Sequence, residues 1–400
     1  MIMKTSIKLR YQNKRKRRLY ISACLVSLSL YVLLDLTLAT VCKDLCPALW
    51  TREHRKKFRI RDQVFHHALA PNILVVDRWG DRYFQLATNN LGFRDARPRH
   101  VELRSDDRRF LFIGDSFTEG QGVTWEESFV GRIQTALHGQ NTEVLNAGVS
   151  SYAPANYYSK VRYFIAERGL SVDHVFVFVD ISDIKSSIDQ YLVTNDHRVV
   201  GRFDPPKPDP FYTRQVRKWL KQNSVTVALL YKFRDFIVYR LKKKKIFEPD
   251  EDSEVKNIPK KLMQETEHNA ESYWCFLEKN KLASNSFDVV GGIEMAQKHM
   301  TLLYDFLSER EINLSLVIYP WPANIANRAR GGRCETIWQS WAIEHGVDLI
   351  NLFDVFMTEE NPISAVRRYF ISNDVHWNAT GHKLVSHSIL DHIKKIGLVR

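Results

Sequence analysis

Short runs of apolar residues alternate with longer amphipathic segments from Phe110 onward. The apolar runs are FLFIGDS, EVLNAG, HVFVFVD, NLSLVIYP and VDLINL, which begin at Phe110, Glu143, His174, Asn313 and Val347. Runs that are apolar at nearly every position are typical of strands buried on both faces of a sheet. Helical patterns follow at residues 126–138, 154–168, 334–344 and 380–396. The alternation predicts an α/β fold, with a doubly wound parallel five-stranded sheet.

Two segments lie outside this alternation. Residues 69–94 alternate around Trp79-Gly80-Asp81, which predicts a β-hairpin that leads into the domain. An insertion at about 190–288 separates the third and fourth strands, and its segment 214–245 has a basic amphipathic helical pattern. This helical insertion could pack on its own domain, lie on anionic lipid or cover an active-site cleft.

A long apolar stretch near the N-terminus predicts a membrane anchor. As a helix, residues 19–41 would span roughly 34 Å, which is enough for the hydrocarbon core of a bilayer. Asp35 is its one charged residue, and no clean cleavage site ends it, although a cleaved signal peptide is the alternative. The predicted organisation is a basic tail at 1–18, a transmembrane helix at 19–41, a linker and hairpin at 42–107, and the α/β domain at 108–398.

The distribution of charge argues against a nucleic-acid partner. The chain of 400 residues has a net charge of +12, but eight basic residues and no acidic one lie in residues 1–18. Subtracting these eight charges leaves +4 for the rest of the chain, which is nearly balanced. The basic residues 14–18 adjoin the helix, so we predict a cytoplasmic N-terminus and a single-pass protein with an extracytoplasmic domain, periplasmic if bacterial.

The cysteine and histidine pattern predicts no metal site and no cofactor. Cys24 lies in the anchor, and either Cys42 with Cys46 or Cys275 with Cys334 could pair in an oxidising compartment; free buried thiols are the alternative. No Cys or His residues have the spacing of a structural zinc site. The adjacent residues 66 and 67 are both His, but they cannot both face one metal from a regular element.

The first predicted strand ends in Gly114-Asp115-Ser116, at the edge of the sheet where ligands bind in open α/β folds. Further glycines at 120 and 122 allow tight turns and a close approach of the backbone. A serine so placed could act as a nucleophile, with its own N–H in an oxyanion hole. A structural turn is almost as good an explanation of this segment alone, because a serine nucleophile needs a base.

A candidate base follows the last strand. The sequence SNDVHWNATGH places Asp374 two residues before His376, ahead of a helix. A carboxylate in this position can orient an imidazole from the same loop.

The segments GDSFTEGQGV and DVHWNATGH resemble the first and last sequence blocks of the SGNH/GDSL hydrolase superfamily, over roughly residues 108–398. The resemblance implies the flavodoxin-like fold of these enzymes, with Ser116 as nucleophile, His376 as base and Asp374 orienting the imidazole. It also implies that the N–H of Gly148, in VLNAGVSSY, joins that of Ser116 in the oxyanion hole. The sequence NNLGFRD, before the domain, is similar to segments of membrane-linked members.

Two departures from the family pattern affect the expected activity. In the third block, Asp180 stands where Gly is usual, and Ser182 stands where an Asn normally donates to the oxyanion. The Ser182 hydroxyl could still donate one hydrogen bond, whereas an ionised Asp180 would oppose the oxyanion. Many members also have Asp three residues before His, where this chain has Asn373, so Asn373 is the alternative orienting residue.

The resemblance and the anchor together imply a serine esterase or deacylase that removes O-acyl groups from a cell-envelope glycan or lipid-linked sugar. Asp180, Tyr319 and Trp321 are candidate substrate-binding residues at the same edge of the sheet, although the aromatic rings could equally be core. One alternative is an O-acyltransferase that modifies an exported polysaccharide, supplied by a membrane acyl-donor protein. The other is a non-catalytic envelope-assembly or glycan-binding protein with a degenerate site.

Overall fold

The computed structural model describes residues 2–45, 55, 57–80, 82–201, 224–227, 230, 233–234, 274–275 and 288–399. The chain forms two compact units. One comprises Met1–Lys56 and Asp204–Glu248, and the other comprises Lys57–Phe203 and Pro249–Arg400. The predicted insertion is therefore divided between the two units. Most of its basic segment at 214–245 lies outside the described residues, as does Cys46.

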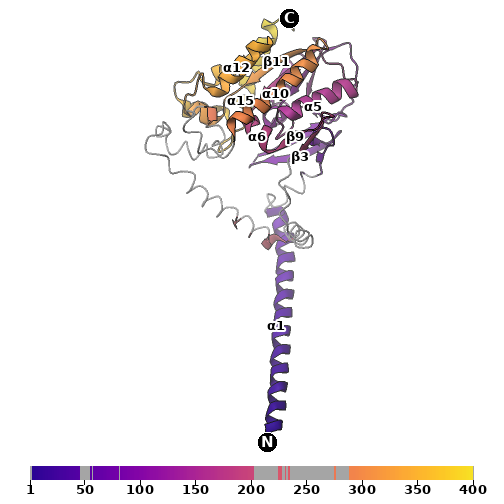
Figure 1. The fold of residues 1–400 in the computed structure, drawn as a ribbon, viewed down its shortest axis with the longest axis vertical. Helices are drawn as coiled ribbons and strands as arrows, with labels where there is room; N and C mark the ends of the chain where they lie inside the picture. The colour runs from indigo at the N-terminus through magenta and orange to yellow at the C-terminus, as the bar shows by residue number, and fades with distance from the viewer. Residues whose placement is uncertain are drawn as a thin grey trace. The chain divides into compact units, whose positions relative to one another are not determined.

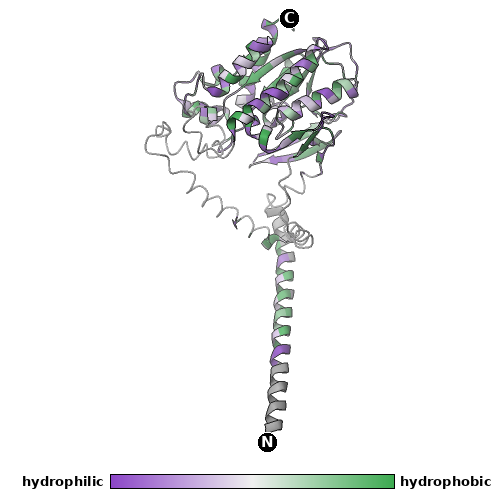
Figure 2. Cartoon of the chain, viewed as in Figure 1, coloured by the Kyte–Doolittle hydropathy of each residue, from purple (hydrophilic) through white to green (hydrophobic). Residues whose placement is uncertain are grey.

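The first unit contains one long helix, α1 (Ile2–Leu45), which has no proline or glycine to interrupt it. Its stretch Lys16–Asp35 is long and apolar enough to cross a bilayer, and no other helix among the described residues meets this test. Figure 2 shows this stretch as the mainly hydrophobic band of the helix. A signal sequence would have the same length and composition, so the finding is one N-terminal apolar helix of membrane-spanning length.

The second unit is built on a mostly parallel sheet, as predicted (Figure 1). Its five parallel strands are β6 (Arg108–Ile113), β7 (Thr142–Asn146), β8 (His174–Val179), β11 (Asn313–Ile318) and β12 (Asp348–Asn351). They lie in the order β12-β11-β8-β6-β7, which reverses direction beside β6. The carboxyl ends of β6 and β8 therefore meet at the switch point, where open α/β sheets bind their ligands.

Three antiparallel strands extend this sheet to eight strands in the described part of the chain, and they correct the predicted boundary at residue 108. They are β3 (Leu74–Trp79), β4 (Arg82–Thr88) and β5 (Arg94–Asp95). The hairpin β3/β4 is present as predicted, but β5 pairs with β7 through Arg94 and Asn146. The hairpin is thus part of the domain. The described residues also form two small antiparallel ribbons, β1 (Arg59–Arg61) with β2 (His67–Leu69) and β9 (Tyr191–Val193) with β10 (Val199–Gly201).

Helices cover both faces of the parallel strands. Every residue of β8 is buried, and so is every residue of β6 and β11 after the first, as expected for strands that are covered on both faces. One group is α5 (Pro154–Arg162), α6 (Asp183–Asp189), α10 (Val289–Ser308) and α12 (Arg333–His345), which pack against one another; Figure 1 shows α5 and α10 side by side. The other group is α4 (Phe129–Ala136), α14 (Pro362–Tyr369) and α15 (Ala379–Lys395). The shorter helices are α3 (Ser116–Glu119), η1 (Tyr163–Glu167), α11 (Pro322–Ala326) and α13 (Phe353–Phe356).

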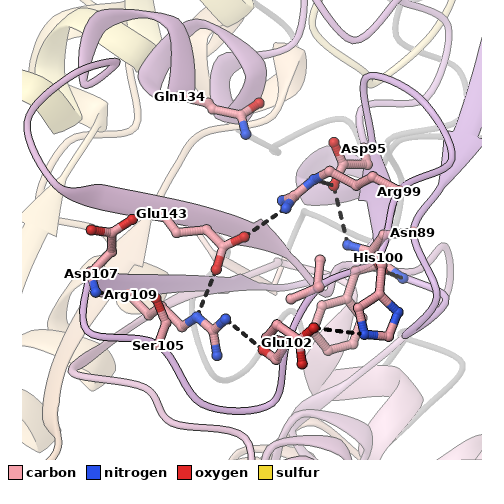
Figure 3. A network of polar contacts seen from close by, with 12 residues as sticks. Asn89, Asp95, Arg99, His100, Glu102, Ser105, Asp107, Arg109, Gln134 and Glu143 are labelled. Atoms are coloured by element: carbon pink, nitrogen blue, oxygen red, sulfur yellow. Dashed lines mark hydrogen bonds and ion pairs between the residues drawn. The ribbon is translucent and has the colours of Figure 1, made fainter.

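A network of charged side chains fixes the segment after β5 to the parallel strands (Figure 3). Glu143 on β7 accepts hydrogen bonds from Arg99 Nη1 at 2.6 Å and from the buried Arg109 Nε at 2.7 Å. Arg99 also donates to Asp95 Oδ2 at 2.7 Å. Breaking such a buried charge pair on one side leaves an uncompensated charge, so this network holds the hairpin segment and the sheet together.

Candidate active site

The loop after β6 presents Ser116 as the first residue of α3. Asp115 caps this helix, because its Oδ1 accepts the N–H of Phe117 at 2.9 Å. A side chain at Gly114 would place its Cβ 2.2 Å from Thr118 Oγ1, so the close approach requires glycine. Gly120 ends α3 with a left-handed φ of 82°, where glycine is favoured. The glycines of GDSFTEGQGV therefore shape a tight strand-to-helix turn beneath the serine.

The predicted serine, histidine and aspartate come together although 260 residues separate the first two. His376 Nε2 lies 2.7 Å from Ser116 Oγ, and His376 Nδ1 lies 2.5 Å from Asp374 Oδ1. Asn373, the alternative orienting residue, is exposed and donates only to Ser372. Burial acts to raise the pKa of Asp374, but the hydrogen bond and charge of His376 outweigh it and lower this pKa below its ordinary value. An ionised Asp374 can therefore orient the imidazole and stabilise its charged form.

Trp79, at the end of β3, completes this arrangement and was missed from the sequence. Its Nε1 donates to Asp374 Oδ2 at 2.9 Å, and its ring meets the His376 ring edge-on at 4.8 Å. Both oxygens of Asp374 are thus held, one by the histidine and one by the hairpin. No sequence pattern points to this role, since the Trp79-Gly80 pair predicts only a turn.

Arg94, from the NNLGFRD segment, holds the far end of the nucleophile loop. Its guanidinium is buried and donates to the carbonyl oxygens of Glu119, Gly120 and Val123. Burial lowers the pKa of Arg94 to about 10, which still leaves it charged near neutral pH. A Cβ at Gly120 would lie 2.4 Å from Arg94 Nη1, so a side chain at position 120 would crowd the guanidinium.

Glu119, the last residue of α3, connects the nucleophile loop to two further segments. Its carboxylate accepts from Arg59 Nη2 at 2.6 Å, from the N–H of Ser150 at 2.7 Å and from Gln121 Nε2. Burial acts to raise the pKa of Glu119, but the charge of Arg59 outweighs it and lowers this pKa. The nucleophile loop is therefore fixed by β1, β5 and the loop after β7.

The predicted oxyanion donors Gly148 and Ser182 both have hydrogen-bond partners inside the protein in this structure. The N–H of Gly148 donates to Asn146 Oδ1 at 3.0 Å. The hydroxyl of Ser182 donates to Asp180 Oδ1 at 2.6 Å, and its N–H donates to the same oxygen at 2.8 Å. Either group would have to share or exchange its partner to stabilise an oxyanion, so these roles stay predictions.

A buried lysine donates a hydrogen bond to the peptide group that contains the Gly148 N–H. Lys160 Nζ donates to the carbonyl oxygen of Ala147 at 2.9 Å, and this carbonyl belongs to the same peptide group as the N–H of Gly148. The aromatic rings of Phe65, Phe93 and Tyr152 surround the ammonium at 5.0–5.3 Å. Burial lowers the pKa of Lys160 to about 7. Its charge therefore changes within the physiological range.

Three buried carboxyl groups lie near the serine. Burial, together with the charge of Asp180, raises the pKa of Asp115 well above its ordinary value. Burial also raises the pKa of Asp180, and it raises that of Asp183 well above normal with help from both neighbours. These shifts favour the protonated forms. They limit the negative charge beside Ser116, which an oxyanion would otherwise meet.

The three predicted substrate-binding residues, Asp180, Tyr319 and Trp321, are buried and contact other protein groups in this structure, so their role in substrate binding stays a prediction. Tyr319 and Trp321 are 1% and 5% exposed. The Tyr319 ring packs on Phe117 and Trp377 at 4.8 and 4.9 Å, and Trp321 Nε1 donates to Asp180 Oδ2 at 2.7 Å. Asp180 has both oxygens occupied by protein donors. The short helix α11 begins directly after Trp321, which is its N-cap residue.

The described residues contain no group of three or more His, Cys, Asp and Glu side chains that could hold a metal ion. His66 and His67 do approach each other, with their Nδ1 atoms 2.9 Å apart, because His66 lies just before β2 with a φ of 72°. Cys275 and Cys334 are free and buried, and Cys24 is free and exposed on α1.

No protein-family model and no curated protein matches the chain. Solved structures match it over about 70% of its length at low identity. An acetyl xylan esterase, AlAXEase, has 14% identity, a TM-score of 0.39, and coverage of 71% of this chain and 99% of its own. Esterase EstA from Pseudoalteromonas sp. has 12% identity, a TM-score of 0.37 and coverage of 72% and 98%. A protein described as lipolytic and of the G-D-S-L family, from Desulfitobacterium hafniense, has 13% identity, a TM-score of 0.35 and coverage of 71% and 98%.

These similarities assign neither a substrate nor a role to any residue. The two sequence blocks are better evidence of the resemblance, because their serine and histidine meet at one edge of the sheet. In these blocks, and in the α/β fold that brings them together, the chain resembles the SGNH/GDSL hydrolases.

Proposed function

We propose that this protein is a serine ester hydrolase in which Ser116, His376 and Asp374 form the catalytic triad. The observation that carries the proposal is the 2.7 Å contact between His376 Nε2 and Ser116 Oγ. This is the geometry that a nucleophile and its general base need. The contact of Asp374 with His376 Nδ1 supports the role of the carboxylate.

The reaction would proceed through a covalent ester on Ser116. The serine oxygen attacks the acyl carbon while its proton moves to His376 Nε2, and a tetrahedral oxyanion forms. The bond to the alcohol then breaks, and the alcohol leaves with the proton from His376. Water attacks the acyl-enzyme with His376 again as base, which releases the carboxylic acid and restores Ser116. No cofactor takes part in these steps.

The N-terminal helix supports a location at the membrane. The basic residues 14–18 adjoin it, so we propose that the catalytic unit lies outside the cytoplasm, in the periplasm if the protein is bacterial. The lipid bilayer is then a partner through residues 19–41. We propose an O-acyl group of an envelope glycan or lipid-linked sugar as the substrate; a transferase with a membrane acyl-donor partner would use the same acyl-enzyme.

A second candidate function follows from the third-block loop. The Ser182 hydroxyl is used inside the protein, and the Gly148 N–H is also engaged. Losing one oxyanion donor typically lowers kcat by roughly 10²–10³-fold. This observation favours slow turnover, and in the limit a non-catalytic glycan-binding protein.

Labelling with a fluorophosphonate probe tests the proposal. We expect the wild-type chain to be labelled, Ser116→Ala to be silent, and Ser372→Ala to be labelled like wild type, since Ser372 is an exposed serine of the histidine loop. A folded wild type that stays unlabelled would exclude the hydrolase and leave the binding function. Release of free acetate from an acetylated glycan, compared with acylation of an unmodified glycan, separates hydrolase from transferase.

A further inference from the structure

The one acidic residue of the apolar N-terminal helix has a partner in the insertion. Asp35 is buried, and its Oδ1 accepts the backbone N–H of Thr226 at 2.9 Å, across 191 residues of sequence. Both residues belong to the same compact unit. A carboxylate within a membrane helix is costly unless it has partners, so this contact supplies what the helix alone cannot.

A second contact lies one helical turn away on the same side of α1. Tyr31 Oη lies 3.4 Å from Ser224 Oγ, and Ser224 Oγ also accepts the N–H of Val227 at 3.1 Å. Residues four apart on a helix are neighbours on its surface, so Tyr31 and Asp35 form one contact site for the segment, which we call the seat. Ser224 and Val225 are buried there.

The docked segment presents large apolar side chains outward. Leu230 and Phe233 are 62% and 64% exposed, and the apolar residues of α1 beside the seat, such as Leu33 and Leu34, are exposed too. Exposed apolar residues of a membrane-spanning helix are covered by lipid. A segment seated on that helix shares the same surroundings, which identifies lipid as the cover for Leu230 and Phe233.

The charges of the segment fit the same location. In the sequence, Lys232 and Arg234 flank Phe233, and four lysines occupy positions 242–245. Basic residues on an apolar segment favour the boundary between acyl chains and anionic headgroups.

We propose that the described residues 224–227, 230 and 233–234 belong to a second membrane-contacting element, seated on α1 at Tyr31 and Asp35 and inserted into an anionic bilayer surface through Leu230 and Phe233. The chain then returns to the membrane between β10 and α10. The inference depends on α1 lying in a bilayer and is independent of the esterase proposal.

Lipid contact is tested on the full chain in phosphatidylcholine vesicles with and without phosphatidylglycerol. An environment-sensitive NBD dye is attached at Phe233→Cys, in a background where Cys24, Cys42 and Cys46 are replaced by serine. We expect quenching by doxyl-labelled lipid, stronger with phosphatidylglycerol, and none for the dye at the exposed position His138→Cys. Unquenched, water-like emission from position 233 would overturn the proposal.

The seat is tested by the rate at which a water-soluble maleimide modifies Val225→Cys, in the same vesicles and background. We expect slow modification with Asp35 or Asp35→Asn, which keeps an acceptor oxygen. Asp35→Leu should raise the rate roughly tenfold, the effect of losing a hydrogen bond to a charged group. Equal rates in Asp35 and Asp35→Leu would show that Asp35 does not seat the segment. Near-UV circular dichroism of each variant reports that the catalytic unit is folded, whether or not it is an enzyme.

Discussion

The loops after β6 and β8 begin alike and end differently. Each leaves a buried strand with an aspartate and then a serine, at neighbouring positions of the same sheet edge. In the first, Asp115 caps α3, and Ser116 is the first helical residue; its hydroxyl lies 2.7 Å from His376 Nε2 and at the longer distance of 3.3 Å from Asp115 Oδ2. In the second, Ser182 itself precedes α6, and its hydroxyl turns back to Asp180. A shift of one position relative to the helix separates a candidate nucleophile from a serine used within its own loop.

The largest effect should come from removing His376, the proposed general base for Ser116 in the first loop. We expect His376→Ala to lower kcat/KM for an acetyl ester by on the order of 10⁴-fold, because general-base catalysis contributes up to this much. Steady-state hydrolysis measures it, with the exposed His138→Ala as the matched control. A loss of less than tenfold would mean that Ser116 does not depend on His376, so that the first loop would differ from the second in structure but not in catalysis.

A smaller loss should follow from removing the hairpin's contact with the triad. Trp79→Phe keeps a ring beside His376 but deletes the hydrogen bond to Asp374 Oδ2. We expect kcat to fall roughly tenfold to a hundredfold with little change in KM, because hydrogen bonds to charged groups contribute about 1.5–3 kcal/mol. Tyr83→Phe, an exposed change in the same hairpin, should be neutral. An unchanged kcat in Trp79→Phe would show that the hairpin's hydrogen bond to Asp374 does not contribute to catalysis.

Ser182→Ala sharpens the comparison directly. Since the hydroxyl serves Asp180 in this structure, we expect kcat to fall by less than about tenfold, well below the loss of roughly 10²–10³-fold for a true oxyanion donor. Single-turnover kinetics with an acetyl ester would measure this. A hundredfold loss would show that the hydroxyl leaves Asp180 and reaches the oxyanion, so that the second loop is catalytic after all.

The last prediction concerns stability and not catalysis. The unfolded chain holds the Lys160 proton up to about pH 10.5 and the folded chain only to about pH 7, so the unfolded state binds more protons between these values. Wild type should therefore gain stability over Lys160→Met as the pH rises through this window, by up to about 1.4 kcal/mol per pH unit, with a constant difference below it. Chemical unfolding in detergent measures the difference. Parallel pH curves for the two proteins would contradict the burial of a charged amine.

Periodicity and motif order were enough to predict the parallel strands and the meeting of Ser116 with His376, because strand ends in such sheets converge by topology. They could not predict Trp79 or Arg94. The roles of both depend on β5 pairing with β7, a long-range contact that leaves no local pattern. The burial of Tyr319 and Trp321 could not be predicted for a related reason. Aromatic residues after a strand look the same in sequence whether the chain continues outward or, as here, turns at once into a helix.

The position of the hairpin has a practical consequence for anyone preparing a soluble version of this protein. Trimming the chain to the motif-bearing part, from Arg108, would delete Trp79 and Arg94 and leave the carbonyls after α3 without their donor. A shortened protein that starts at Lys57 would retain both residues, along with the ion pair between Arg59 and Glu119. Crystallisation trials and assays should therefore begin from that residue.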